Sequence, residues 1–295
     1  MPLTQDSDLA GTVYAKVIEP LIIAYQYDDV TAISWFRYAS IEAEKTATAG
    51  FPRWVKNATA AVATEQTVIA TTTLSTTNVD IAVSRVGIAR EIGATAQEDS
   101  IIGNALYTER FVMDAAILFG ESFDTDGTAL FASLTAAQGT TSVALQLSVL
   151  VQAMGTQRAN KAKGMQVIHM HDLQLKQLQV AQLAATATPW AIFFQPNPDG
   201  SSQFGGYFMN SPVWASSKNP TANAAADRVG AVFTNGRSDD GAPAFCPFAF
   251  VMKRKPSSLT LPDILQDGSL WASYCRYGVG IPANNFGTKF ISQNS

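Results

Sequence analysis

The sequence predicts an α+β protein in which one long helix carries several layers of strands. Three observations lead to this prediction: a helical pattern over residues 95–121, two alternating runs of β-prone residues before it, and an alternation of helix and strand patterns after it. The chain has 295 residues, of which 47% are hydrophobic and only 15% are charged. It is therefore long enough to bury a sizeable core, and a surface with so few charges is often covered by partners.

The composition argues against several classes of protein. A net charge of −4 and an isoelectric point near 5.2 disfavour a dedicated nucleic-acid binder, which would present a basic patch to phosphates. Cys246 and Cys275 are too few for a disulfide framework, and we expect both to be buried free thiols. No run approaches ~20 apolar residues, and residues 1–11 lack the pattern of a signal peptide. We expect no membrane contact and a protein that stays in the cytoplasm.

Residues 1–44 are expected to form an arm that packs on a larger body. Pro20 prevents one continuous helix in this segment. Trp35, Phe36 and Tyr38 need burial that so short a segment cannot provide by itself.

Residues 45–92 predict a long two-stranded hairpin rich in Thr, Ala and Val. Apolar positions alternate from Val68 to Leu74, a turn is expected at residues 76–78, and the alternation resumes from Val79 to Val83. A hairpin alone is marginal in water, so we expect another subunit to cover it. The residues expected to contact that subunit are Trp54, Val68, Leu74, Val79, Ile81 and Arg85.

The long helix is expected to begin with a capping box formed by Thr95 and Glu98, and to end at Gly120. Glu98 and Asp99 suit the positive end of the helix dipole. Arg110 and Asp114 are four residues apart and are expected to pair on the exposed side. The apolar face is expected to consist of Ile102, Ala105, Leu106, Val112, Met113, Ala116, Ile117 and Phe119.

After this helix the pattern changes to short helices and strands, the rhythm of an α/β layer. A turn is expected at residues 124–127, and a helix capped by Thr141 or Ser142 follows. Its inward face would consist of Val143, Leu147, Val151 and Met154. Asp172 is expected to cap a further helix, with its inward residues at Leu175 and Leu178.

Five strands are expected in the second half of the chain, at residues 165–169, 207–216, 229–234, 248–253 and 269–281. Residues 188–206 are rich in Pro and Gly and predict a loop. Bends are expected at residues 256–258 and at Pro262. The last two strands have no sequence neighbour to pair with, so we expect them to return to the sheet beside the long helix.

The search for chemistry finds no enzyme signature. His169 and His171 are two residues apart on an expected strand, which places both on one face, and some metallohydrolases use this spacing. They are the only histidines, so a metal would need carboxylates from elsewhere. Residues 253–255 form the densest basic run, expected as a solvated strand end or as a local contact to phosphate or carboxylate. We predict no catalytic residue, no metal and no cofactor.

The order of these parts resembles the major capsid protein of tailed bacteriophages, over nearly the whole chain. The similarity lies in the layout: a short N-terminal arm, a Thr-rich hairpin, a long acid-capped helix, an α/β insert and a returning strand. Three stretches carry it: GFPRW at residues 50–54, VGIAREI at residues 86–92 and YGVGIP at residues 277–282. The resemblance implies an N-terminal arm over residues 1–44 and an E-loop hairpin over residues 45–92. It implies a P-domain formed by residues 93–134 and 246–295, with a spine helix over residues 96–120, and an A-domain over residues 135–245.

The resemblance also implies a function. Hexamers and pentamers of this structural protein would assemble into the icosahedral capsid of a virion around double-stranded DNA, in the host cytoplasm. Each E-loop would lie over the P-domain of a neighbour. Closed symmetry would place the chain in slightly different environments, and hinges at Gly93, Gly120 or Gly139 would let it adapt to them. The implied partners are many copies of the chain, a separate scaffolding protein, a portal, in some shells a cement protein, and packaged DNA held by weak non-specific contact.

One departure from the family predicts a shell held together without covalent links. Some members join neighbours through an isopeptide bond from an E-loop lysine, but no lysine occurs here between Lys56 and Lys161. Three alternatives remain open: a cytoplasmic nanocompartment shell of the same layout, a metallohydrolase using His169 and His171, and a monomeric β-rich binding module.

Overall fold

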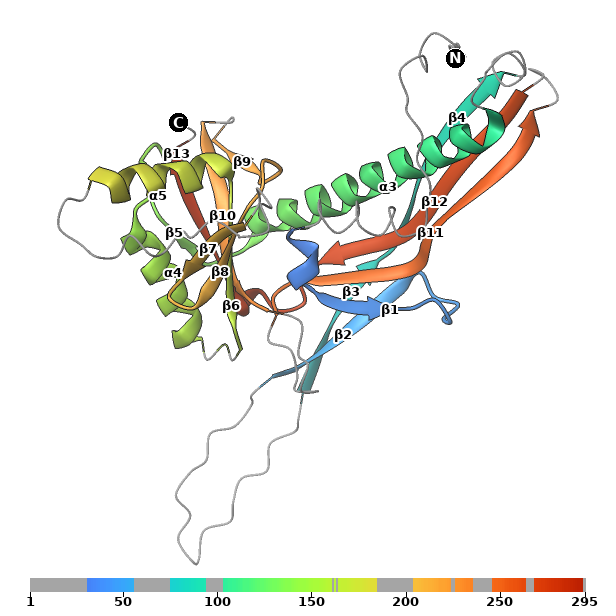
Figure 1. Cartoon of the computed structure of the whole chain (residues 1–295). Helices are drawn as coiled ribbons and strands as arrows, with labels where there is room; N and C mark the ends of the chain where they lie inside the picture. Colours follow the sequence, from blue (N-terminus) through green and yellow to red (C-terminus); the bar gives the residue numbers. More distant parts are fainter. Residues whose placement is uncertain are drawn as a thin grey trace, which may run out of the picture.

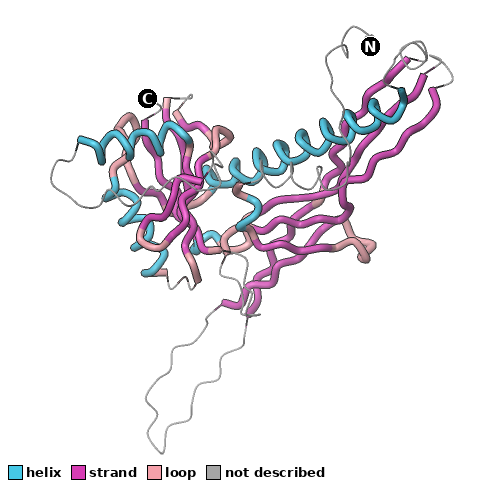
Figure 2. Tube along the Cα trace, viewed as in Figure 1, coloured by secondary structure: helices cyan, strands magenta, loops and turns pink. Residues whose placement is uncertain are grey.

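The computed structural model describes residues 31–55, 75–93, 103–160, 162, 164–184, 204–223, 226–235, 246–263 and 268–293. The long helix α3 (Gly103–Ala129) runs along a sheet of long strands and ends against a second unit that contains two shorter helices (Figure 1). Strands from both ends of the described chain lie side by side in the first unit (Figure 1). Figure 2 shows that, apart from the long helix, this unit consists mainly of strands. No helix in this part of the chain is long and apolar enough to cross a bilayer.

Four strands form the sheet beside α3. They lie in the order β1 (Arg37–Ser40), β11 (Ala249–Asp263), β12 (Gly268–Gly280), β4 (Ser84–Gly93), and only the β1–β11 pair is parallel. The expectation that the late strands return to this sheet is confirmed for β11 and β12. The short 3-10 helix η2 (Ile33–Trp35) precedes β1.

The bends expected at residues 256–258 and at Pro262 are wrong, because β11 continues to Asp263. The ladder with β12 shifts register between Met252 and Arg254 and again between Arg254 and Ser257. A proline cannot donate to a ladder, and such irregularities let Pro256 lie within a strand. β4 also differs from the expectation, since residues 84–92 pair along β12 and not within the hairpin.

The hairpin consists of β2 (Thr48–Val55) and β3 (Ser75–Ala82), paired antiparallel from Thr48 opposite Ala82 to Val55 opposite Ser75. The turn expected at residues 76–78 is wrong, because these residues pair with residues 52–54 inside the ladder. Thr is a good strand former, and Asn78 alone carried the turn signal. Residues 56–74, with Val68 and Leu74, lie outside the described residues.

The helix α3 continues past Gly120 to Ala129, so the expected end and the turn at residues 124–127 are both wrong. A Cβ on Gly127 would lie 2.8 Å from the Ile33 side chain and 3.2 Å from the Phe36 ring. This glycine therefore marks close packing and does not end the helix. The capping residues Thr95, Glu98 and Asp99 lie outside the described residues.

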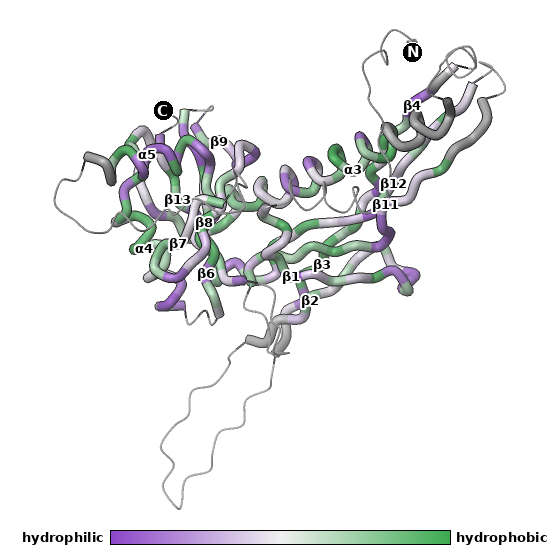
Figure 3. The backbone as a smooth tube through the Cα atoms, in the orientation of Figure 1, coloured by the Kyte–Doolittle hydropathy of each residue, from purple (hydrophilic) through white to green (hydrophobic). Residues whose placement is uncertain are grey.

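The buried side of α3 follows a spacing of four residues, and the hydropathy along the helix alternates accordingly (Figure 3). Ala116 and Phe119 are buried as expected, whereas Met113, Ile117 and Val112 are only half-buried. The buried residues are Phe111, Ala115, Ala116, Phe119, Gly120, Phe123, Asp124, Gly127 and Thr128.

The second unit is a seven-stranded sheet covered on one face by α4 (Leu147–Ala159) and α5 (Asp172–Ala184). Its main path is β5 (Ala137–Gln138), β13 (Gly287–Gln293), β10 (Asp227–Thr234), β6 (Gln166–Met170), β8 (Ser211–Ala215), β7 (Phe204–Phe208), and β9 (Thr221–Ala222) pairs with β10. The expected buried strand at 165–169 is confirmed as β6. β13 lies in this sheet, although residues 246–295 were expected beside the long helix.

Two details of the helices in this unit differ from the expectation. α4 begins at Leu147 with no side-chain cap, so Thr141 and Ser142 do not cap it. Val143 and Val151 are exposed, and the buried face consists of Leu150, Ala153, Met154 and Gln157. In α5, Leu178 is fully buried and Leu175 is half-buried, as expected. The 3-10 helices η3 (Leu130–Ser133) and η4 (Asn284–Phe286) complete the described elements.

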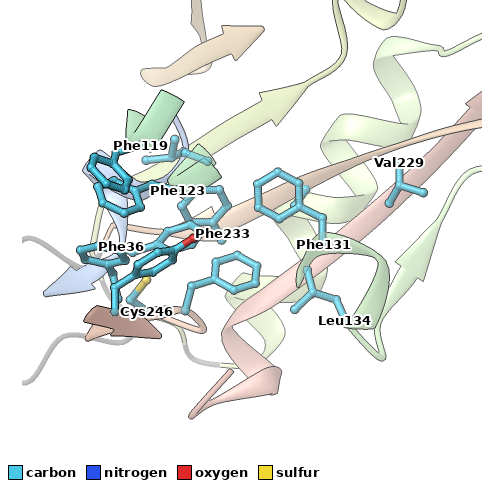
Figure 4. Packing of buried hydrophobic residues seen from close by; sticks show 14 of the residues in the cluster. Phe36, Phe119, Phe123, Phe131, Leu134, Val229, Phe233 and Cys246 are labelled. Carbon is cyan, nitrogen blue, oxygen red and sulfur yellow. The ribbon is translucent and has the colours of Figure 1, made fainter. Parts of the chain in front are cut away.

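An aromatic core joins the two sheets at the end of α3 (Figure 4). Phe36 stacks on Phe248 with ring centroids 4.7 Å apart, and Phe123 meets the Tyr277 ring edge-on at 4.5 Å. Phe233 belongs to β10 of the seven-stranded sheet, and its ring centroid lies 5.9 Å from that of Phe131. Cys246 and Cys275 are buried free thiols, as expected.

Candidate assembly interface

The base of the hairpin is anchored on its own subunit. Ile81 is 4% exposed and packs with Phe51 against Ala249 and Val251 of β11. A Cβ on Gly280 would lie 2.7 Å from the Ile81 side chain, so the glycine gives this residue room. The burial leaves little of Ile81 for a neighbour, although the sequence marked it as a contact residue.

The rest of the described hairpin is open. Thr77, Asn78 and Asp80 are exposed and Val79 is half-buried. In the described part of the chain β2 and β3 pair only with each other, so each has a free edge on which another strand could align. Trp54 pairs through its backbone with Thr76. The geometry suits contact with a second chain.

The exposed side of α3 is tied to β4. Asp114 pairs with Arg90 at 3.3 Å. The partner that the sequence indicated, Arg110, lies outside the described side chains, so that pair stays a prediction. Arg90 and Asp114 are partly exposed, at 52% and 33%, so their contact contributes little to stability.

A buried polar network lies where α3, the N-terminal residues and the seven-stranded sheet meet. Asp124 is fully buried and accepts hydrogen bonds from the backbone N–H groups of Thr31 at 3.1 Å and Ala32 at 2.8 Å. The Ser216 hydroxyl donates to the same carboxylate at 3.3 Å. One helix carboxylate therefore holds the start of the described chain against the second unit.

His169 extends this network. Its Nε2 lies 2.9 Å from the Thr31 hydroxyl, which in turn donates to Asp124. Burial lowers the pKa of His169 to about 4, against the opposing effect of Asp124, so the imidazole is neutral near pH 7. The described residues contain no group of three metal-binding side chains.

His171 has a separate structural role. β6 ends at Met170, so the two histidines do not share a strand face as expected. The Nδ1 atom of His171 accepts a hydrogen bond from the Leu173 N–H at 3.0 Å, and the side-chain Oε1 of Gln174 accepts one from the backbone N–H of His171 at 3.0 Å. This is a capping box, so His171 caps α5 in place of Asp172. Burial lowers the pKa of His171, with Arg228 adding to the effect.

A groove of about 370 Å³ lies where the end of α4 meets the turn between β7 and β8. Met209 and Asn210 form this two-residue turn with φ values of 48° and 65°, as hairpin turns of this length require. Met165 and Met209 line the groove and are 42% and 50% exposed. Asn210 and Ser211 also line it.

The buried network is the feature that sequence reasoning missed. Thr31, Asp124 and Ser216 belong to three distant segments, and no spacing connects them. The one available signal was the position of Asp124, which lies one turn after Gly120 on the buried side of the helix.

Comparison with known proteins supports the fold. No protein-family model and no curated protein matches the sequence. Solved structures match over almost the whole chain. The head of Helicobacter pylori bacteriophage KHP40 matches with a TM-score of 0.65 and 9% identity, over 96% of this chain and 93% of that one. The mature capsid of bacteriophage PhiM1 matches with a TM-score of 0.64 and 11% identity, over 97% of this chain and 91% of that one.

A virus-like particle from Pyrococcus furiosus also matches, with a TM-score of 0.57 and 8% identity over 92% of this chain and 97% of that one. Identities this low establish the fold alone. The chain has the α+β fold of tailed-phage capsid proteins, as the resemblance predicted.

Proposed function

We propose that the chain is the structural subunit of an icosahedral phage capsid, which self-assembles as hexamers and pentamers around double-stranded DNA. The observation that carries the proposal is the match to capsid and head structures over more than 90% of both chains. A match this complete leaves no room for a large additional domain in the aligned part. The match favours the use of this fold as a shell subunit.

The surface of the subunit supports assembly. The described part of the hairpin has free strand edges, and large apolar side chains such as Tyr38, Leu259 and Met209 are about half exposed. Free strand edges and exposed apolar side chains are liabilities in a monomer and become contacts in a closed shell. The histidines, which carried the metallohydrolase alternative, are both engaged in buried structural hydrogen bonds.

The finer points of the proposal follow from this role. The shell would be held without covalent links and assembled in the host cytoplasm. A separate scaffolding protein, a portal and, in some shells, a cement protein would complete it, and the packaged DNA would touch its inner surface only weakly. The subunit would act through contacts and would need no catalytic group.

Assembly of the purified chain tests the proposal. The expressed protein should sediment as particles, and negative-stain micrographs should show closed shells of uniform size. A chain that remains a stable monomer at high concentration, with or without co-expressed neighbouring proteins, would refute the shell function and favour a monomeric binding module.

A second candidate is a nanocompartment shell that encloses proteins and no genome. The match to the virus-like particle from Pyrococcus furiosus favours it. Nuclease-protected DNA in particles purified from the native source would support the phage capsid. Particles that contain protein cargo and no DNA would support the nanocompartment.

A further inference from the structure

Three arginines lie side by side across the outer face of the four-stranded sheet. Arg276 of β12 is directly opposite Arg85 of β4 on one side and Arg254 of β11 on the other. Directly paired residues point to the same face of a sheet, so all three guanidinium groups emerge together. The opposite face packs on α3 through Trp271, as its burial shows.

Two of the three arginines lie against one aromatic ring. Tyr274 precedes Arg276 by two residues on the same face, and the guanidinium carbons of Arg85 and Arg254 lie 4.7 and 4.2 Å from its ring centroid. β12 lies between β4 and β11, so the two cations reach the ring from both neighbouring strands. We call these four residues the arginine row.

This arrangement is costly in an isolated subunit. Like charges directly opposite each other on neighbouring strands destabilise a sheet. Within the described residues, no carboxylate lies within 4 Å of these guanidiniums. Cation–π contacts at exposed positions offset the repulsion only in part. An anionic partner that covers the row would remove this repulsion.

The surroundings of the row favour a protein partner over nucleic acid. Leu259 lies on the same face, opposite Ala272, and is 49% exposed. Tyr and Arg beside an exposed apolar side chain are characteristic of the centre of protein interfaces. The net charge of −4 on the whole chain would also repel DNA phosphates at long range.

The chain itself contains a matching acidic segment. Residues 1–30 contain one basic residue, Lys16, and five acidic ones, Asp6, Asp8, Glu19, Asp28 and Asp29. One minus five gives −4, so this segment carries the entire net charge of the chain. The remaining residues are balanced in charge, so the segment accounts for all of the net negative charge that a second copy offers.

We propose that the arginine row binds the acidic N-terminal segment of a second copy of the chain. The proposal rests on the proposed function, because it names one contact by which the subunits would hold each other. Arginine forms paired hydrogen bonds with carboxylates, and covering the row would exclude water from these bonds.

Charge exchange between two variants tests the proposal. Variant one carries Arg85→Glu and Arg254→Glu, and variant two carries Asp6→Lys and Asp8→Lys. Each variant alone should need at least about tenfold more protein than the wild type to form particles, as measured by sedimentation, a loss of about 1.4 kcal/mol per contact. An equimolar mixture should assemble at a lower concentration than either variant alone, because the acidic row of variant one can then meet the two lysines that variant two carries in its segment.

The controls separate this contact from general charge effects and from misfolding. Lys45→Glu with Lys176→Glu makes the same change in net charge at exposed positions, in the loop between β1 and β2 and on α5, and should assemble like the wild type. Circular dichroism identifies any variant that is not folded, and Arg85→Lys with Arg254→Lys then serves as the milder replacement. The Lys variant should lose part of the assembly, because it keeps the charges and loses the paired hydrogen bonds.

Several results would overturn the proposal. Normal assembly of variant one, or a mixture that assembles no better than either variant alone, would mean that the row does not meet the segment of a second copy. Loss of binding to double-stranded DNA with unchanged assembly would assign the row to phosphates. A wild-type chain that never assembles would instead refute the proposed function itself.

Discussion

The buried carboxylate of Asp124 should be among the most sensitive positions for stability. Asp124→Ala would leave the N–H groups of Thr31 and Ala32 without an acceptor at a site that water does not reach. Each unsatisfied buried donor costs about 1–3 kcal/mol, and the loss of the Ser216 contact adds to this. We expect the free energy of unfolding to fall by about 3–5 kcal/mol, and by roughly half as much for Asp124→Asn, which keeps one acceptor oxygen.

Urea unfolding of the unassembled chain, followed by tryptophan fluorescence, measures this loss. Glu121→Ala is the matched control, because Glu121 is exposed on the same helix, and it should change stability by no more than about 0.5 kcal/mol. If Asp124→Ala does not fold, Thr31→Val, which removes only the hydroxyl, should cost about 1 kcal/mol. A loss below about 1 kcal/mol for Asp124→Ala would refute the view that this carboxylate holds the junction together.

Four other outcomes are expected. Gly278→Ala should lower stability by about 1–3 kcal/mol in thermal unfolding, because a Cβ would collide with the Ala82 carbonyl oxygen; an unchanged melting temperature would contradict the close packing. The pKa of His169 is about 4 in the folded chain and 6.5 when unfolded, so only the unfolded chain takes up a proton between these values. The free energy of unfolding should therefore fall by about 3 kcal/mol as the pH drops from above 6.5 to 4. Urea titrations at several pH values should show this dependence, and His169→Gln should remove it. Burial raises the pKa of Cys246 to about 12, so a thiol reagent should label it at least ~100-fold more slowly in the native chain than in urea. Boiled particles should give a single band on a denaturing gel, and a ladder of linked oligomers would disprove the non-covalent shell.

The parts of the fold that the sequence predicted well are those in which local pattern and tertiary packing agree. β6 and β10 are continuous apolar runs buried on both faces, and both were predicted near their observed positions. α5 combines an acidic first turn with Leu178 on its inward side, and its position was also predicted.

The end of α3 was not predictable, because the signal depends on packing. Gly120 and Gly127 look like stop signals, since each costs about 1 kcal/mol inside a helix relative to alanine. In the structure both are buried, and a side chain on Gly127 would collide with η2. Contacts from a segment roughly one hundred residues away override the local cost.

The candidate site was only partly predictable for the same reason. Sequence reasoning identified the hairpin as the part that needs a partner, and it named Arg85 without its neighbours in the arginine row. Arg254 and Arg276 join Arg85 only through strand pairing across three distant segments. A residue spacing within one segment cannot encode such a row, because the register is set by the whole sheet.

The way α3 is held at both ends bears on where a subunit could flex. Near its start the helix packs on β12 through Phe111 and Trp271, and near its end Asp124 fixes it to the second unit. Gly120 lies between these attachments, inside a continuous hydrogen-bonded helix with a buried surface. A hinge there would break both the helix and the aromatic core at once, so Gly120 is a poor candidate.

Gly139 is the better candidate for a hinge. It lies outside the helices, between β5 and α4, and has φ = +85°, a conformation that residues with side chains rarely adopt. Movement at this position would shift α4 over its sheet while α3 and the arginine row keep their geometry. The fold thus separates the surface that we assign to contact with a neighbour from the position that we propose as the hinge.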